Sequence, residues 1–526
     1  MKLWKKFFNR DRKEVLTSVT DNPVKKTSKE RLVKKIDKNI KKIEDIIGIS
    51  SDVIIRNINI NNHSAALVFI DGLVDKQTIN ESILQPLLKV DINEHIKTAN
   101  MLEYLETNIL TVNETLILDS LEEMIEGILN GDTVLLLDNY KKAIVLSSKG
   151  WEQRSITDPP TESVIRGPRE GFTENIRVNT SLIRRKIKSP ALRIKNYNIG
   201  RYSRTNVSIC YIEGLTNKHL LEELTERIKN IDIDYIAESG YIEQLIEDES
   251  ISPFPQMLST ERPDRVAANL QEGRIAVLTD GSPFALVLPL TITVFLHSPE
   301  DYYDRFIIAS FIRLIRLFAA FVTLTLPSLY IAAISFHPEM IPTRLALAFA
   351  GGRGQVPFPS YIEAFAMEAI IELLREGSLR LPSPIGPTIG IVGALIIGEA
   401  AVSASIVSPF MVIIVALTTI ASFVVPNYGG AVALRLLRFP LMLITSLLGF
   451  YGFMIGIIII SIHLAALKSF GIPYLTPFTP SRISDLKDSI LRPPIWLMRK
   501  RPFHLRTKNR KKFTAQGDDD RNERTR

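Results

Sequence analysis

The stretch FPLMLITSLLGFYGFMIGIIIISIHLAAL (439–467) dominates the interpretation of this chain, because it contains no Asp, Glu, Lys or Arg. About 20 consecutive apolar residues suffice to cross a lipid bilayer as a helix. Working outward, residues 317–338 also lack charge, and Glu399 is the only charged residue between 381 and 434. We therefore predict membrane spans at about 309–337, 385–402, 406–425 and 441–467.

The region before residue 303 has a different character and contains an internal repeat. When the sequence is shifted by 142 residues, ALVFIDGL (66–73) lies over SICYIEGL (208–215), and Asp138 lies over Asp280. Each copy contains an apolar strand ended by an acidic-Gly turn, a helix, and two strands in a hairpin. The repeat predicts two similar α/β subdomains.

These patterns predict a duplicated α/β cytosolic domain followed by an all-α polytopic membrane domain. The expected segments are a basic, disordered N-terminal segment (1–44), α/β subdomain 1 (45–150), an inter-lobe segment rich in Arg, Pro and Gly (151–194), α/β subdomain 2 (195–300), a membrane domain (301–470) with four or more spans, and a basic cytoplasmic tail (471–526).

Charge and cysteine content narrow the classes of function. Residues 1–42 hold 15 Lys and Arg against 5 Asp and Glu, and residues 468–526 hold 15 against 6. Such ends either lie near anionic lipid head groups or are solvated and disordered, and no nucleic-acid motif accompanies them. The single Cys210 excludes an internal disulfide. Because the N-terminus has no apolar signal segment, we expect the soluble part in the cytoplasm.

The basic tail also places the C-terminus in the cytoplasm by the positive-inside rule. Four spans would then put Arg435 and Arg438 on the outside, which fits that rule poorly. An additional span or a broken helix would remove the conflict.

Residues 340–384 form a broken, amphipathic segment in which 361–376 has a helical pattern. Glu368 and Glu372 share one face of this helix. That face either lies wet at the membrane surface or lines an aqueous path where carboxylates select cations. Glu399 is either protonated between helices or part of the same path. Glu368, Glu372 and Glu399 are therefore the candidate ion-path residues.

No catalytic constellation, metal site or cofactor motif is present, so we expect no enzyme, no metal and no cofactor. The segment between the lobes contains the loop Arg166-Gly167-Pro168-Arg169-Glu170-Gly171-Phe172. Its charged residues suit either a brace between the lobes, with Arg166, Arg169 and Glu170 in ion pairs, or a loop that docks an anion or a partner.

Four motifs occur in a familiar order. They are the loop 166–172, Asn179-x2-Leu182-Ile-Arg-Arg185, Pro382-Ser-Pro-Ile-Gly-Pro-Thr-Ile-Gly390 and Ser408-Pro409. Over roughly residues 45–500 the chain resembles the A subunit of the GerA-type spore germinant receptors. It is also similar to the stage V sporulation AF protein, but the Pro-Arg-Glu form of the loop resembles the receptor more. Glu399 departs from the Gln of many members.

The resemblance implies an integral protein of the spore inner membrane with its N-terminal domain and C-terminal tail in the cytoplasm. It implies a transporter-like B subunit and a lipoprotein C subunit as partners, a homo-oligomer, and a role of the loop 166–172 in assembly or signalling. The complex would sense nutrients and trigger release of monovalent cations and dipicolinate. This subunit would form a germinant-gated cation channel or, alternatively, a non-conducting scaffold. Transport by this chain alone is less favoured, since the spans show no inverted repeat.

Overall fold

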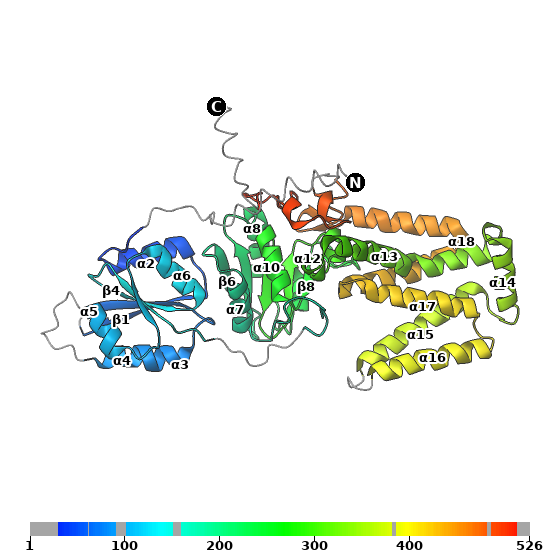
Figure 1. Ribbon diagram of the computed structural model, residues 1–526. Helices are drawn as coiled ribbons and strands as arrows, with labels where there is room; N and C mark the ends of the chain where they lie inside the picture. The colour runs from blue at the N-terminus through cyan, green and yellow to red at the C-terminus, as the bar shows by residue number, and fades with distance from the viewer. Residues whose placement is uncertain are drawn as a thin grey trace, which may run out of the picture. The chain divides into compact units, whose positions relative to one another are not determined.

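The computed structural model describes residues 30–61, 63–90, 101–150, 159–380, 386–480 and 485–512 (Figure 1). Contacts divide the chain into two compact units. The α/β unit comprises the described parts of Met1–Glu247, Met257–Pro289 and Pro493–Arg526, and the helical unit comprises Asp248–Gln256 and Leu290–Arg492. The predicted combination of a duplicated α/β part with an all-α part is confirmed. Outside the described residues lie most of the expected disordered N-terminal segment, parts of the inter-lobe segment and tail, and Pro382–Ile385 of the Pro-rich motif.

The first lobe is an antiparallel sheet with strand order β1-β2-β4-β5-β3. Its strands are β1 (Val53–Ile60), β2 (His63–Ile70), β3 (Thr115–Leu118), β4 (Thr133–Leu137) and β5 (Ala143–Leu146). One face packs on helices α2 (Ile36–Ile47) and α6 (Leu121–Asn130). The other packs on α4 (Gln85–Lys89), α5 (Met101–Tyr104) and two π-helical turns (Ile79–Leu84, Leu105–Ile109), the first of which follows the short helix α3 (Lys76–Thr78).

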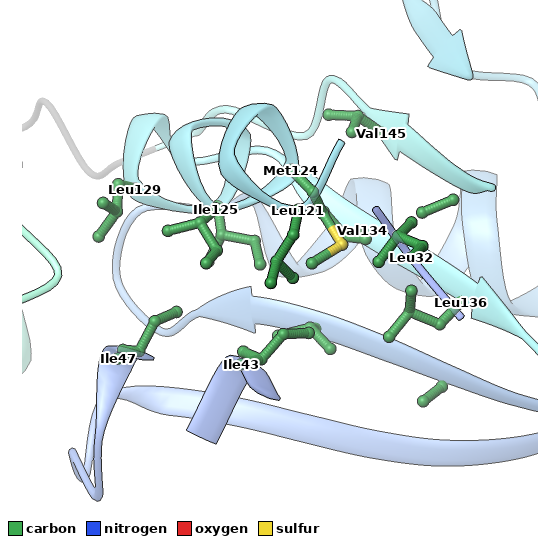
Figure 2. Close-up of a cluster of buried hydrophobic side chains, with 14 of the residues drawn as sticks. Leu32, Ile43, Ile47, Leu121, Met124, Ile125, Leu129, Val134, Leu136 and Val145 are labelled. Carbon is green, nitrogen blue, oxygen red and sulfur yellow. The ribbon is translucent and has the colours of Figure 1, made fainter. Parts of the chain in front are cut away.

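Alternation along the strands explains why this sheet is apolar on both faces. Val134 and Leu136 point into the core beneath α2 and α6, which Figure 2 shows. Leu135 and Leu137 point into the opposite core. Because successive side chains of a strand point to opposite faces, a central strand buried on both sides has to be continuously apolar.

The second lobe repeats the first with strand order β6-β7-β9-β10-β8. Its elements are β6 (Leu192–Ile199), β7 (Thr205–Ile212), β8 (Leu258–Thr260), β9 (Ile275–Thr279), β10 (Ala285–Leu288), α7 (Ile176–Lys186), α8 (Lys218–Lys229), α9 (Ser239–Ile246) and α10 (Pro263–Glu272). The identical strand order confirms the duplication that the 142-residue offset predicted.

The repeat begins earlier in the chain than the sequence indicated. The side chain of Asn39 exchanges hydrogen bonds with the main chain of Val33 at 3.0 and 2.7 Å, and Asn179 does the same with Thr173 at 2.8 and 2.6 Å. Helices α2 and α7 are therefore equivalent. The expected boundaries at residues 45 and 195 fall inside α2 and β6, because charge hid the helical period of Ile36, Ile40, Ile43 and Ile47.

A buried ion pair joins the two lobes. Arg184 on α7 is 0% exposed, and its Nε and Nη2 donate to Asp52 of the first lobe at 2.9 and 3.0 Å. Its Nη1 donates to the Leu192 carbonyl at 3.1 Å. Beside this pair, the amide of Ser51 donates to the carbonyl of Ile194 at 2.8 Å. The brace between the lobes is thus centred on Arg184.

In the helical unit, short helices α11 (Ile292–Leu296) and α12 (Glu300–Tyr303) precede the long ones. These are α13 (Phe306–Ser335), α14 (Thr343–Arg353), α15 (Ser360–Arg380), α16 (Gly386–Ser403), α17 (Pro409–Val424) and α18 (Tyr428–Ala466). Helices α13 and α18 are long and apolar enough to cross a membrane, and α17 is a shorter apolar helix. Phe318 of α13 is 67% exposed, and several other large apolar side chains on this helix are also exposed. Such a surface suits lipid and indicates membrane association.

Helix α18 is a hairpin of two antiparallel arms, not one straight rod. Its backbone breaks at Gly449, where φ is 61° and ψ is −140°. A Cβ on Gly456 would lie 2.4 Å from Leu441 Cδ1, and one on Gly452 would lie 2.2 Å from the Ile444 carbonyl oxygen. Residues this far apart in sequence meet only if the helix folds back. The absence of a side chain at Gly452 and Gly456 therefore allows the two arms to pack closely.

Contacts along α13 give the direction of the other helices. Near its end, Tyr330 bonds Ser408, which precedes α17, and Ser335 bonds Ser360 at the start of α15. Phe336 packs on the hairpin turn at Gly449. We call this end of the helical unit the tip. At the opposite end, the base, His463 in the second arm bonds Ser252 at 2.8 Å.

At the base, α13 begins in a network of ion pairs. Asp301 accepts from Arg313 Nε at 2.9 Å and from Arg316 Nη1 at 2.6 Å, and all three residues are buried. Asp488 accepts from Arg313 Nη1 at 2.8 Å. Both arginines are therefore paired inside the helical unit. Arg313 also holds Asp488, and with it the segment 485–492, at the base.

We predict that Arg184→Ala lowers the free energy of unfolding of the α/β unit by about 3–5 kcal/mol, because it leaves Asp52 buried without its partner. Urea unfolding of the full chain provides the measurement. Arg177→Ala is the control, since Arg177 is exposed and lies 3.6 Å from Asp71; it should cost less than about 1 kcal/mol. Equal effects of the two changes would contradict the brace.

Gly449→Ala should lower the melting temperature of the chain in detergent, because Gly449 has positive φ and an added Cβ would lie 2.8 Å from Phe336. A backbone with this positive φ and extended ψ alone costs a residue with a Cβ about 1–3 kcal/mol. Gly351→Ala, at a helical position with open space around it, is the matched control and should be neutral. A straight α18 would tolerate both changes equally.

Candidate functional site

Helix α15 turns its charged face inward. Glu368 is 0% exposed and Glu363 is also buried, while Leu373 on the same helix is 72% exposed. A helix at a water-exposed surface has the reverse arrangement, with charges outward. Charges buried within a bundle and apolar side chains outside are typical of helices in lipid, where ionisable groups face protein and pair with one another.

Two arginines from the first arm of α18 meet this face. Arg438 Nη2 lies 2.8 Å from Glu368 Oε2, and Arg435 Nη1 lies 3.4 Å from Glu372 Oε2. Arg438 Nη2 is also 3.5 Å from Glu372 Oε1. Residues three or four apart lie on one face of a helix. The two carboxylates therefore face the two guanidinium groups, and the order of the contacts shows that the two helices run antiparallel.

A third pair lies nearer the tip. Arg353 at the end of α14 places Nη2 3.1 Å from Glu363 Oε1. The other oxygen of Glu363 accepts the Ser408 amide at 2.8 Å, and the Ser408 hydroxyl accepts the Met411 amide at the start of α17. The Ser408-Pro409 motif is thus a helix cap held by a buried carboxylate.

We call these six residues the charged seam: Glu363, Glu368, Glu372, Arg353, Arg435 and Arg438. Three acidic and three basic side chains make it formally neutral. Several of its buried polar atoms make no hydrogen bond among the described residues, including Glu368 Oε1 and Nε and Nη1 of Arg438. Buried polar atoms need partners, so the seam has polar capacity for water or ions. Within the described ranges, no group of His, Cys, Asp and Glu could hold a metal ion.

The candidate ion-path residues are thus divided between the buried charged seam and an exposed position. Glu368 and Glu372 lie together in the seam. Glu399 lies on α16, has an exposed side chain, and forms no ion pair with any residue that the structure describes. The sequence pattern did not point to Glu363, Arg353 or the partners of Glu368. One feature of the sequence could have indicated these pairs. Arg435 and Arg438 are three residues apart in an apolar region, and Glu368 and Glu372 are four apart, so each pair lies on one face of its helix and the charges are opposite.

The motif loop Arg166–Phe172 belongs to the second lobe. Phe172 is buried and its amide donates to the Glu261 carbonyl at 2.8 Å. Glu170 lies 3.1 Å from Arg185 and 2.9 Å from Lys186 on α7. Burial favours the neutral carboxyl, but these two cations outweigh it and lower the pKa of Glu170. The ion pairs of Glu170 are therefore formed within one lobe and not across the two.

A buried arginine outside the loop fixes its other half. Arg262, before α10, donates from Nη2 to the Pro168 carbonyl at 2.7 Å and from Nη1 to the Glu162 carbonyl at 3.1 Å. In contrast, Arg166 and Arg169 are exposed, and the preceding Ile165 is 95% exposed. The loop is thus held on the second lobe, while its two arginines reach the surface.

Comparison with known proteins identifies the family. The profile of the family described as Bacillus/Clostridium GerA spore germination protein matches residues 41–504. The chain belongs to the GerA family of spore germination proteins. This family membership confirms the resemblance inferred from the four motifs. GerA proteins are not a known family of enzymes.

Curated GerA relatives match over most of their length. Spore germination protein KA of Bacillus subtilis (strain 168) is 44% identical over 92% of this chain and 89% of its own. Spore germination protein GerLA of Bacillus cereus is 42% identical over 89% and 95%. A B. subtilis relative described as the uncharacterized membrane protein YfkQ is 43% identical over 86% and 88%.

Among solved structures, the crystal structure of the N-terminal domain of the A subunit of the Bacillus megaterium spore germinant receptor GerK3 is 37% identical. It covers 49% of this chain and 96% of that chain, with a TM-score of 0.39.

We predict that Arg438→Gln destabilises the chain by about 3–5 kcal/mol, because it leaves Glu368 buried without its closest cation. The double variant Arg438→Gln, Glu368→Gln should recover much of this loss, since both groups are then neutral. Melting in detergent with size-exclusion profiles gives the measurement. Arg380→Gln, at an exposed pair with Glu376, is the control. A double variant no more stable than the single one would show that Glu368 and Arg438 are not coupled.

Proposed function

We propose that this GerA protein is the A subunit of a nutrient-sensing germinant receptor in the inner membrane of the dormant spore. The observation that carries the proposal is a GerA match over residues 41–504, in a chain whose α15 buries paired charges and exposes apolar side chains. Membership of the GerA family supports a role in spore germination. The apolar exposed face and charged buried face of α15 support a location in a membrane.

The proposed topology has six crossings, formed by α13, α15, α16, α17 and the two arms of α18. Contacts at the tip and the base support it, because each successive helix reverses direction. An even number of crossings returns the chain to its starting side. The α/β unit and the basic tail then share the cytoplasm, as the positive-inside rule requires. Arg435 and Arg438 no longer conflict with this rule, since they are paired inside the bundle.

The proposed assembly joins several copies of this chain with a transporter-like B subunit and a lipoprotein C subunit. In this assembly the motif loop would contribute to assembly or signalling. Its backbone is fixed by Arg262 while Arg166 is exposed beside Ile165, an apolar side chain that a partner can cover. Exposed arginine next to exposed apolar surface is common at protein interfaces.

For the finer mechanism, we propose a germinant-gated cation pathway to which Glu368, Glu372 and Glu399 contribute carboxylates. In this conformation Arg438 and Arg435 neutralise the first two. Cations would be attracted only after α15 and the first arm of α18 move apart. Nutrient binding in the complex would have to favour that separated state, because a ligand shifts an equilibrium only through its differential affinity.

The alternative is a non-conducting scaffold that couples a ligand-binding partner to downstream ion and dipicolinate release. The neutrality of the charged seam favours the scaffold, because paired charges can fix the packing of α15, α14 and α18 without taking any part in conduction. In that case the three glutamates matter for stability and not for conduction.

Glu399→Gln separates these alternatives, because Glu399 is exposed and its replacement should not unfold the chain. If the carboxylate lies on the pathway, germinant-triggered cation flux in liposomes holding the purified receptor complex should fall roughly tenfold, as when a favourable contact of about 1.4 kcal/mol is lost. Glu376→Gln, at an exposed position on α15, is the control.

Unchanged flux in Glu399→Gln would remove that residue from the pathway. No flux with any germinant in the unaltered complex would leave the scaffold as the function. A further variant, Arg166→Ala, should reduce recovery of the B and C subunits with this chain while leaving its melting temperature unchanged.

A further inference from the structure

The tail after the last apolar helix contains an ordered basic segment on the α/β unit. We call residues 499–512 the C-terminal strap. Its two ends run side by side: the Arg501 amide donates to the Arg510 carbonyl and the Lys512 amide to the Arg499 carbonyl, both at 2.8 Å. Strand-like pairing of Lys500 with Lys511 completes this short antiparallel arrangement. The strap is therefore a folded element.

The strap is anchored on the second lobe. Thr507 is buried, and its methyl group lies 2.4 Å from where a Cβ on Gly273 would be. Arg501 Nε donates to the Gln271 carbonyl at 2.8 Å, and Lys512 Nζ lies 2.9 Å from Glu272. Burial alone would raise the pKa of Glu272, but Lys512 and Arg274 outweigh it and bring that pKa to about 2. The anchor is thus fully charged at neutral pH.

Most of the charge on the strap is not used by this anchor. The 14 residues RKRPFHLRTKNRKK include eight Lys and Arg and no acidic residue. Exposed side chains belong to Lys500, Arg506, Lys508, Arg510 and Lys511. None of these five forms an ion pair with any residue in the described part of the chain. A fixed cluster of like charges repels itself, so it favours an anionic partner.

The residues before the strap indicate what that partner is. Leu491, Ile495 and Leu497 are exposed apolar side chains between the last apolar helix and the strap. Apolar side chains followed by a basic cluster close to a membrane span are typical of segments that contact anionic lipid. Proteins that bind single-stranded nucleic acid offer exposed aromatic rings for stacking. The aromatic rings of the strap, Phe503 and His504, are partly buried, and Arg510 covers Phe503 at 4.4 Å.

We infer that the C-terminal strap binds anionic phospholipid head groups on the side of the membrane where the last helix ends. Because Thr507 and Lys512 fix the strap to the second lobe, lipid binding also tethers that lobe. The charge pattern alone allowed a solvated, disordered tail, whereas the folded and anchored strap presents its cations together. The inference rests on the proposed membrane placement of the tail, and it requires neither germinant sensing nor conduction.

A fluorescent label at Asn509→Cys tests the inference in the full-length chain. The native Cys210 is buried and its pKa is raised to about 12, so labelling should be confined to the new thiol. The chain is placed in nanodiscs of phosphatidylcholine alone or with about one third phosphatidylglycerol. We expect a blue shift in the anionic discs that is lost when salt rises from about 0.1 to about 1 M.

The strap variant Lys500→Gln, Arg506→Gln, Lys508→Gln, Lys511→Gln should lower the ratio of bound to unbound strap roughly 100-fold or more, as each cation near an anionic membrane contributes about a fivefold factor. The matched control is Lys38→Gln, Lys41→Gln, Lys141→Gln, Lys142→Gln, four exposed lysines of the first lobe. This control should keep the shift.

Three outcomes would overturn the inference. The first is an equal shift in neutral and anionic discs, and the second is a shift retained by the strap variant. The third is a larger shift when transfer RNA is added to neutral discs than in anionic discs without RNA, which would assign the strap to nucleic acid. Failure of the chain to enter discs at all would instead contradict the proposed membrane placement, and the strap inference with it.

Discussion

A charge in apolar surroundings must be paired, and this constraint organises the helical unit. Glu368 is buried, and burying a carboxyl group is costly unless a cation lies beside it, which Arg438 provides. The pairing requires α15 to lie along the first arm of α18 in antiparallel orientation. It also turns Leu373 outward, which is stable only where the surroundings are as apolar as the side chain. The polarity of one helix thus connects its packing, its neighbours and its solvent.

The break at Gly449 sets the length of the arm that carries Arg435 and Arg438. One straight helix over Tyr428–Ala466 would be about 58 Å long at 1.5 Å per residue, well beyond the roughly 30 Å of a bilayer core. Folding at Gly449 gives two arms of suitable length and brings the chain back to the base. The small residues Gly452 and Gly456 allow the arms to approach. From the base the chain continues to the C-terminal strap on the second lobe, so the sequence leaves the α/β unit and returns to it.

The α/β unit combines duplication with asymmetry. Both lobes share strand order and the same asparagine hydrogen bonds, and Asp138 and Asp280 each accept the amide of the first residue of α2 and α7. Each copy therefore folds by the same local rules. The ion pair between the lobes breaks the symmetry of the repeat, because Arg184 of the second lobe pairs with Asp52 of the first. Among the residues that the structure describes, the exposed motif loop and the strap likewise lie on the second lobe alone. Duplication therefore provides the scaffold, and residues found in one copy provide the specific contacts.

The sequence by itself determined the apolar helices, the duplication, the family and the shared face of Glu368 and Glu372. These features depend on composition and on periods of two or 3.6 residues, which are local properties. Only the tertiary structure decided that this face points inward, that Arg435 and Arg438 neutralise it, that α18 folds back, and that the brace centres on Arg184. Each of these is a contact between residues far apart in sequence, and a helical period specifies a face without specifying what lies opposite it.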